Sequence, residues 1–241
     1  MTYAFLSDIH SNLEALQTVL ADIPAEATVL CLGDIVGYGP NPNECVALLR
    51  ERNVLTVLGN HDVAAIDDFG ITYFTDLARE AMRWTQQVID KQHTQWLNRL
   101  AYELRLPDFL LVHGAPVRYF EYCKNVEIAR KAFAATDAPL IFLGHTHVAE
   151  YYALAGDQTV QHQHMQFGGK LTLEPDQRYI INVGSVGQPR DLNPQASYVV
   201  YDTQTREVTW RRVTYPVDAV MAKIAAAQLP PVLAQRLQEG R

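Results

Sequence analysis

The sequence predicts an α/β fold, and two observations carry that prediction. Short apolar runs recur along the chain, and each is too short for a helix, so we expect buried β-strands there. The runs cover residues 3–6, 28–32, 54–58, 109–112, 140–143 and 179–183. Between the first two runs, apolar residues recur at helical spacing. This alternation of strand and helix is typical of α/β proteins.

The helix expected between the first two strands has apolar positions at Leu13, Leu16, Leu20 and Ile23. Ser11 and Glu14 have the spacing of a capping box, so we expect Ser11 to begin this helix. Residues 67–106 predict a helical insertion of two helices, which would form a cap beside a functional site. We expect one domain over residues 1–241 that includes this insertion.

Further along the chain, residues 125–136 predict another helix. Strands are then expected at residues 150–154, 159–167, 169–174, 196–202 and 207–213. Residues 217–241 predict one or two surface helices, broken at Pro230 and Pro231. His162 and His164 alternate in the second of these strands. They would be able to chelate a metal, but the wet face of an exposed strand is the favoured interpretation.

Composition narrows the classes of partner. The chain has 241 residues, a formal net charge of −7 and no basic run, which argues against binding to duplex nucleic acid. No segment has the length of apolar sequence that a membrane span needs, and the N-terminal residues lack signal-peptide features. The three cysteines are odd in number and lack CxxC spacing. We therefore expect free thiols without a function, in a reducing cytoplasm. We also expect no membrane partner.

Residues able to bind metals follow five predicted strands in succession. The motifs are D-x-H, G-D, G-N-H-D, H-G and G-H-x-H. Ligands collect at the carboxyl ends of strands in α/β sheets. Residues two apart share a face in extended chain, so we expect Asp8 to converge with His10, and His145 with His147.

The number of donors exceeds what one ion needs. Imidazoles and carboxylates together favour Zn, Mn, Fe or Ni, and the surplus indicates two divalent transition-metal ions. Two neighbouring cations repel, and a carboxylate between them offsets that repulsion. Asp34 follows its strand alone and is held in a Gly- and Pro-rich turn, so we expect it to bridge the ions.

In this order, the five motifs resemble those of the calcineurin-like metallophosphoesterase superfamily, and G-S-V-G-Q-P-R-D at 184–191 is similar to its bacterial phosphodiesterase branch. The resemblance implies a four-layer α/β/β/α sandwich of two mixed sheets. It also implies that a hydroxide between the metals attacks phosphorus, and that His61 protonates the leaving oxygen. The first metal would be held by Asp8, His10 and His147, the second by Asn60, His113 and His145, and both by Asp34.

The chain departs in one place from the Ser/Thr phosphatase branch of the family it resembles. That branch has the motif G-D-x-x-D-R-G after the second strand, whereas this chain has G-D-I-V-G-Y-G. Gly37 and Tyr38 replace that carboxylate and arginine, which argues against a protein phosphatase and leaves open which residue orients His61. The candidates for substrate contacts are Asn12, Tyr38, Arg118 and Arg190.

The expected function is hydrolysis of a small or nucleotide-type phosphodiester. A phosphomonoesterase and a dinucleoside polyphosphate hydrolase are the alternatives among hydrolases, and a catalytically inactive scaffold is the alternative of another class. The expected partner is a small phosphoester substrate. The oligomeric state is left open, with a homodimer among the alternatives.

Overall fold

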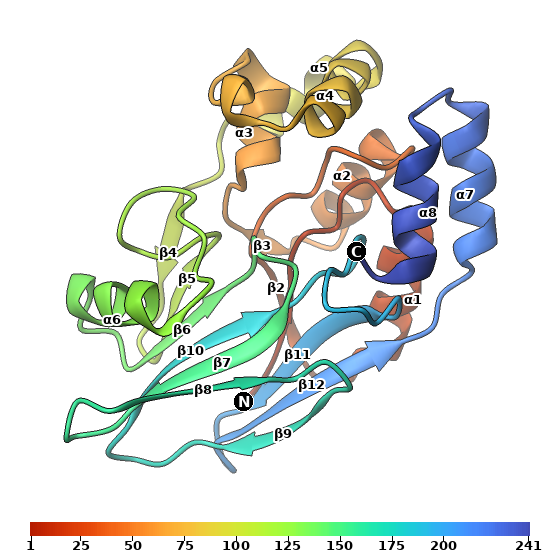
Figure 1. The fold of residues 1–241 in the computed structure, drawn as a ribbon. Coiled ribbons are helices and arrows are strands. Elements are labelled where there is room, and N and C mark those ends of the chain that lie inside the picture. Colours follow the sequence, from red (N-terminus) through yellow and green to blue (C-terminus); the bar gives the residue numbers. More distant parts are fainter.

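The structure, a computed structural model, describes all 241 residues and contains two six-stranded mixed sheets (Figure 1). The first sheet has the order β3-β2-β1-β11-β12-β9, and the second β4-β5-β6-β10-β7-β8. Strands β1, β2 and β3 are parallel, as are β5, β6 and β10, while the remaining pairs are antiparallel. The parallel strands therefore bring their carboxyl ends to one edge of each sheet.

The strands lie close to the predicted runs. Their bounds are β1 Thr2–Leu6, β2 Thr28–Cys31, β3 Leu55–Thr56, β4 Glu103–Arg105, β5 Leu110–Val112, β6 Leu140–Leu143, β7 Ala149–Leu154, β8 Val160–His164, β9 Gly169–Thr172, β10 Arg178–Val183, β11 Ala196–Asp202 and β12 Glu207–Val213. Strand β3 is much shorter than the predicted 54–58, because only two of its residues pair with β2. Strand β4 was not predicted.

The helices are α1 Leu13–Asp22, α2 Pro42–Glu51, α3 Asn60–Asp67, α4 Asp76–Val88, α5 Lys91–Leu97, α6 Val126–Ala135, α7 Val217–Ala226 and α8 Pro231–Glu239, with a 3-10 turn at Ile71–Tyr73. The two helices expected within 67–106 are α4 and α5. They gather with α3 at one end of the molecule (Figure 1). None of these helices has both the length and the apolar character needed to cross a bilayer.

Three apolar clusters divide the molecule into layers. One lies between the sheets and includes Phe5, whose ring stacks on Phe142 with centroids 3.6 Å apart. A second packs α1, α2, α7 and α8 on the outer face of the first sheet, and a third packs α6 on the outer face of the second. The four-layer α/β/β/α arrangement is confirmed.

The predicted capping box at α1 is wrong. The helix begins one residue later, because the Asn12 side chain accepts a hydrogen bond from the Ala15 amide at 3.1 Å. Ser11 has a φ of 54°, and its hydroxyl has no hydrogen-bond partner. The chain is still turning at Ser11, so this residue cannot serve as the cap.

Candidate metal centre

The turns after β1, β2, β5 and β6 bring six of the seven predicted ligands together, all except Asn60, and the start of α3 adds His61 to them. Three overlapping groups have donor atoms within 4.8 Å of one another. They are Asp8, His10 and His147; Asp34, His113 and His145; and His10, Asp34 and His61. All seven of these side chains are buried.

The ligands reach the site from tight turns and not from extended chain. Asp8, His10, Asp34, His145 and His147 all have φ between 49° and 67°, which is the left-handed region. These residues therefore do not continue the strands as extended chain, contrary to the prediction. His10 and His147 do approach Asp8, whereas His145 belongs to the group on the other side of Asp34.

Four imidazoles are held in a defined tautomer by backbone carbonyls. Because a carbonyl can only accept, Nδ1 of His10 donates to Val36 O at 3.1 Å, and Nδ1 of His147 donates to Gln188 O at 2.6 Å. His113 Nδ1 donates to Leu32 O at 2.7 Å. In His145 the roles reverse, and Nε2 donates to the carbonyl of Phe120 at 3.0 Å.

When these rings are neutral, the other nitrogen of each presents a lone pair to the centre. His10 Nε2 and His147 Nε2 lie 3.1 Å apart, and His113 Nε2 lies 3.1 Å from His145 Nδ1. Such separations match neighbouring ligands on one ion with bonds of about 2.0–2.2 Å. A hydrogen bond to each outer nitrogen is also the usual support of a metal-binding histidine. The donor set fits divalent metals.

The two aspartates lie between these imidazoles. Asp34 Oδ2 is 3.3 Å from His113 Nε2 and 3.7 Å from His10 Nε2, so it spans both groups. Asp8 Oδ1 has no hydrogen-bond partner and lies 3.2 Å from His147 Nε2. Asn60 Oδ1 is also buried and unpartnered. These orphaned oxygens are the atoms that cations would satisfy.

The pKa shifts follow from this crowding. Burial raises the pKa of Asp34, but His113 and His61 outweigh it and hold that pKa well below its usual range. Burial lowers the pKa of His113, but the Asp34 and Asp8 carboxylates raise it to about 9. Burial and, after it, the charge of the neighbouring His113 lower the pKa of His145 to about 3. The buried carboxylates thus favour the charged form of His113, whereas burial and the neighbouring charge disfavour that of His145.

Glycines allow the turns to approach one another closely. A Cβ on Gly59 would lie 2.0 Å from Asp34 Oδ1 and 2.2 Å from the Asp34 amide nitrogen. Gly33 has a φ of 92°, and its Cβ would lie 2.4 Å from the Gly59 nitrogen. The Asp34 carboxylate also accepts from the His61 amide at 2.8 Å. These contacts fix Asp34 in one position.

His61 is held by aromatic packing and not by a carboxylate. Asp62 points away, since its oxygens accept from the amides of Ile35, Val36 and Gly59. The His61 ring packs against Phe74 and Tyr38, with centroid distances of 4.4 and 4.7 Å. A Cβ on Gly37 would lie 2.4 Å from His61 Nδ1, which has no hydrogen-bond partner.

Burial lowers the pKa of His61 to about 4, although the Asp34 carboxylate opposes this shift. The Arg190 guanidinium lowers the pKa further. The ring is therefore neutral near pH 7 in the free protein. An anion bound beside it would raise the pKa again, since negative charge favours the protonated imidazole.

The four candidate substrate residues differ in their surroundings. The Tyr38 ring lies against His10 and His61, and the Arg190 guanidinium carbon lies 5.5 Å from the Tyr38 ring centroid. The Arg190 backbone amide donates to His147 O at 3.0 Å, and its Nε is buried without a partner.

The remaining two candidates have other partners. Asn12 caps α1 through its oxygen and donates through its nitrogen to Gly187 O at 2.9 Å, so its amide already holds the turn beside the site. The Arg118 side chain is 78% exposed and pairs with Glu121. Arg190 does not pair with Asp191, which instead bonds Arg212.

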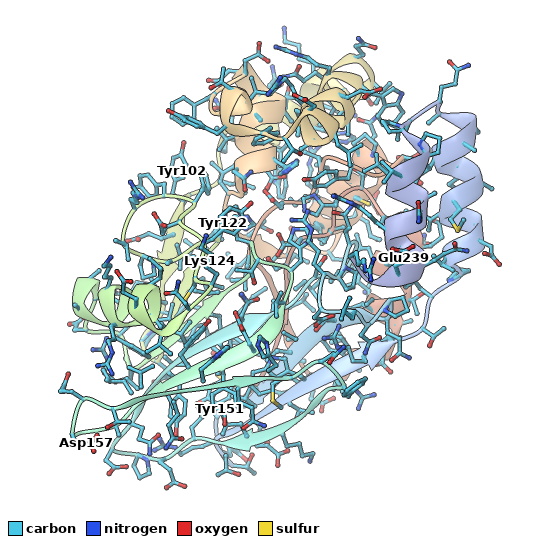
Figure 2. All side chains as sticks on the ribbon, viewed as in Figure 1. Tyr102, Tyr122, Lys124, Tyr151, Asp157 and Glu239 are labelled. Atoms are coloured by element: carbon cyan, nitrogen blue, oxygen red, sulfur yellow. The ribbon has the colours of Figure 1, made fainter.

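Two aromatic rings outside the five motifs lie beside the site. The Tyr122 ring stacks on His145 with centroids 3.8 Å apart, and Phe74 lies against His61. Tyr122 belongs to the loop between β5 and α6, and Figure 2 shows it toward the middle of the molecule, on the inner side of that loop. Neither residue belongs to a local motif, so no pattern in the sequence distinguishes them from core aromatics.

Comparisons with known proteins agree with this geometry. The calcineurin-like phosphoesterase superfamily domain matches residues 1–206. The chain is 37% identical to an uncharacterized protein of Methanocaldococcus jannaschii, over 99% of this chain and 98% of that one. It is 25% identical to serine/threonine-protein phosphatase 1 of Salmonella typhimurium, over 70% of this chain and 88% of the other.

Among solved structures, a metallophosphoesterase from Sphaerobacter thermophilus is 40% identical, with a TM-score of 0.89 and complete coverage of both chains. The fold and its ordered His and Asp clusters define a metallophosphoesterase. This chain belongs to the calcineurin-like phosphoesterase superfamily.

Proposed function

We propose that the protein is a dinuclear-metal-dependent hydrolase of small or nucleotide-type phosphodiesters. The observation that carries this proposal is the pair of donor groups on either side of Asp34, with His61 beside them. The first metal would be held by Asp8, His10 and His147, and the second by Asn60, His113 and His145. Asp34 would bridge the two. When bound, two divalent cations supply the positive charge that binds phosphate and activates an attacking water.

The chain's own residues would position and protonate the substrate. His61 lies within the same cluster of donor atoms as His10 and Asp34, so a phosphate held at the centre lies within its reach. There the imidazole would donate a proton to the leaving oxygen. Arg190, on the turn that bonds to His147, would contact a phosphoryl oxygen. Tyr38 would hold both His61 and Arg190 in place through its ring.

The charge near the centre favours a diester over a monoester. A diester carries one negative charge at neutral pH, whereas a monoester carries up to two. Arg190 lies beside the metal ligands, and its guanidinium lowers the pKa of His61 and of His147. Arg118, in contrast, is exposed and paired with Glu121. The half-exposed ring of Tyr122, 44% accessible, offers a face on which a nucleobase would stack.

Phosphomonoester hydrolysis is the second candidate, because one relative is named a serine/threonine-protein phosphatase. Gly37 and Tyr38 weaken that alternative, because they stand where the motif of the protein phosphatase branch has a carboxylate and an arginine. Stacking on Tyr122 would equally suit a dinucleoside polyphosphate. The choice therefore depends on measured selectivity.

The test compares an aryl phosphodiester with the matching aryl phosphomonoester. Metal-stripped protein is assayed, and then the same protein with Mn, Ni, Zn, Fe or Mg restored. We expect metal-dependent turnover that favours the diester. Turnover of the monoester alone would replace the diesterase proposal with a phosphatase. No turnover of either compound with two ions bound would favour the inactive scaffold.

A further inference from the structure

A third cluster of metal-binding side chains lies outside the centre described above. Glu150, His162 and His164 have donor atoms within 4.8 Å of one another. Glu150 lies on β7, and both histidines lie on β8, the strand at the edge of the second sheet. None of the three belongs to the donor groups around Asp34.

The strand register explains why these side chains converge. Glu150 pairs directly with His164, and Tyr152 pairs with His162. Side chains two apart on a strand point to one face, so Glu150, His162 and His164 share a face of the β7–β8 pair. The hairpin that joins these strands extends to the outer edge of the molecule, where Asp157 is labelled in Figure 2.

The carboxylate in this cluster is buried, although the histidines are open to solvent. The side chain of Glu150 is only 4% exposed, against 25% for His162 and 63% for His164. Its ion-pair contacts are with these two histidines alone. A buried carboxylate without an arginine or lysine is unfavourable unless another cation compensates its charge.

Neighbouring groups orient two of the three side chains. The Tyr152 hydroxyl donates to Glu150 Oε1 at 3.3 Å, which leaves Oε2 facing the histidines. The His162 ring stacks flat on the Tyr152 ring, with centroids 4.4 Å apart and an interplanar angle of 6°. Supports of this kind accompany metal ligands and fix the direction of their donor atoms.

The distances suit a tetrahedral ion. Two ligands at about 2.0–2.1 Å from a tetrahedral centre lie about 3.3 Å apart. Glu150 Oε2 lies 3.3 Å from His164 Nδ1 and 2.7 Å from His162 Nε2. A small rotation of the partly exposed His162 ring would widen the shorter separation.

We propose that Glu150, His162 and His164 form a third metal site, which takes Zn²⁺ or a similar late transition-metal ion. Two imidazoles and one carboxylate leave the fourth position to water, and the exposed face of His164 provides the path of entry. The bound ion links β8 to β7 and so stabilises an edge strand whose residues are largely exposed.

The test is the number of Zn²⁺ ions bound per chain, measured by equilibrium dialysis of tag-free protein followed by elemental analysis. We compare the wild type with the double variant His162→Ala/His164→Ala. The control is Gln161→Ala/Gln163→Ala, which alters the opposite face of the same strand. We expect the histidine variant to bind one Zn²⁺ fewer than both other proteins. This difference does not depend on how many ions the Asp34 centre holds.

Thermal unfolding provides a second readout. Added Zn²⁺ should raise the melting temperature of the wild type more than that of the histidine variant. His164→Ala alone, at a mostly exposed position, keeps the test valid if the double variant folds poorly. Equal stoichiometry and equal Zn²⁺-dependent stabilisation in wild type and His164→Ala would overturn the proposal. Phosphoesterase activity is measured in parallel, so a failure of the proposed function is distinguished from a failure of this site.

Discussion

The Nε2 atoms of His10 and His147 face each other at 3.1 Å, while the Nδ1–H of each ring is bonded to a backbone carbonyl. In the neutral rings, both Nε2 atoms therefore present lone pairs, and the two lone pairs repel. Asp8 adds a buried carboxylate within 4 Å of both rings. The polypeptide thus holds together groups that are favourable neighbours only when a cation lies between them.

Metal removal should destabilise the protein for this reason. Ions that bind only the folded state add about 2.7 kcal/mol per site to the free energy of unfolding at a concentration of 100 times the dissociation constant. Chelator-treated protein should unfold at a lower temperature, and restored Mn²⁺ or Zn²⁺ should reverse the change. Identical melting curves with and without metal would show that the cluster does not bind these ions.

Asp34→Asn should remove most of the bound metal and reduce turnover by more than about 100-fold. A neutral amide cannot offset two cations, although it retains the shape of the carboxylate. Metal content and turnover would be measured together. Asp157→Asn is the control, because Asp157 is exposed at the tip of a hairpin far from the donor groups. Full metal content and activity in Asp34→Asn would exclude the bridging role.

His61→Ala should reduce turnover by about 10²–10⁴-fold, the range for loss of a general acid. Metal content should remain near that of the wild type, because His61 is assigned to the substrate and not to the ions. Phe74→Leu should keep the metal and lower turnover less, since Phe74 only packs against the His61 ring. Loss of metal in His61→Ala would instead make His61 a ligand.

Gly59→Ala should destabilise the fold by at least about 2 kcal/mol and weaken metal binding. The added Cβ would meet the backbone nitrogen of Asp34 at 2.2 Å, so one of the two turns would have to shift. Gly156→Ala is the matched control, because no atom lies within 4 Å of its added Cβ. Urea unfolding of both variants measures the difference. Equal stability would show that the turns around Asp34 adapt.

The three cysteines should be unreactive in the folded protein. All are buried, and burial raises the pKa of Cys123 to about 12 and shifts the pKa of Cys31 and Cys45 upward as well. At pH 8, a thiol with a pKa of about 12 is ionised in about one molecule in ten thousand. Ellman's reagent should detect no thiol in native protein and all three in denaturant. Rapid native labelling would contradict this burial.

The convergence of most of these side chains was predictable from the sequence, because they follow buried strands directly. A strand such as β6 is recognisable from four apolar residues, and His145 comes two residues after it. Parallel pairing then forces such strand ends together, so order along the chain becomes proximity in space.

The errors arose where the backbone leaves the regular elements. Ser11 had the right spacing for a capping box, but its positive φ excluded it. The same conformation at His10 and His145 rules out the extended chain expected there, and only Asp8 and His10 share a donor group as predicted. The packing of Phe74 and Tyr122 on the site depends on loops far away in the sequence. No local pattern specifies such contacts.

The left-handed conformation of five candidate ligands costs the fold stability. For residues other than glycine, this conformation is less stable by about 1–2 kcal/mol each, and Asp8, His10, Asp34, His145 and His147 all adopt it. Glycine at any of these positions would relieve that strain and remove a ligand in the same step. The complete set of side chains in these turns therefore indicates that the strain serves the candidate metal centre and not the stability of the fold.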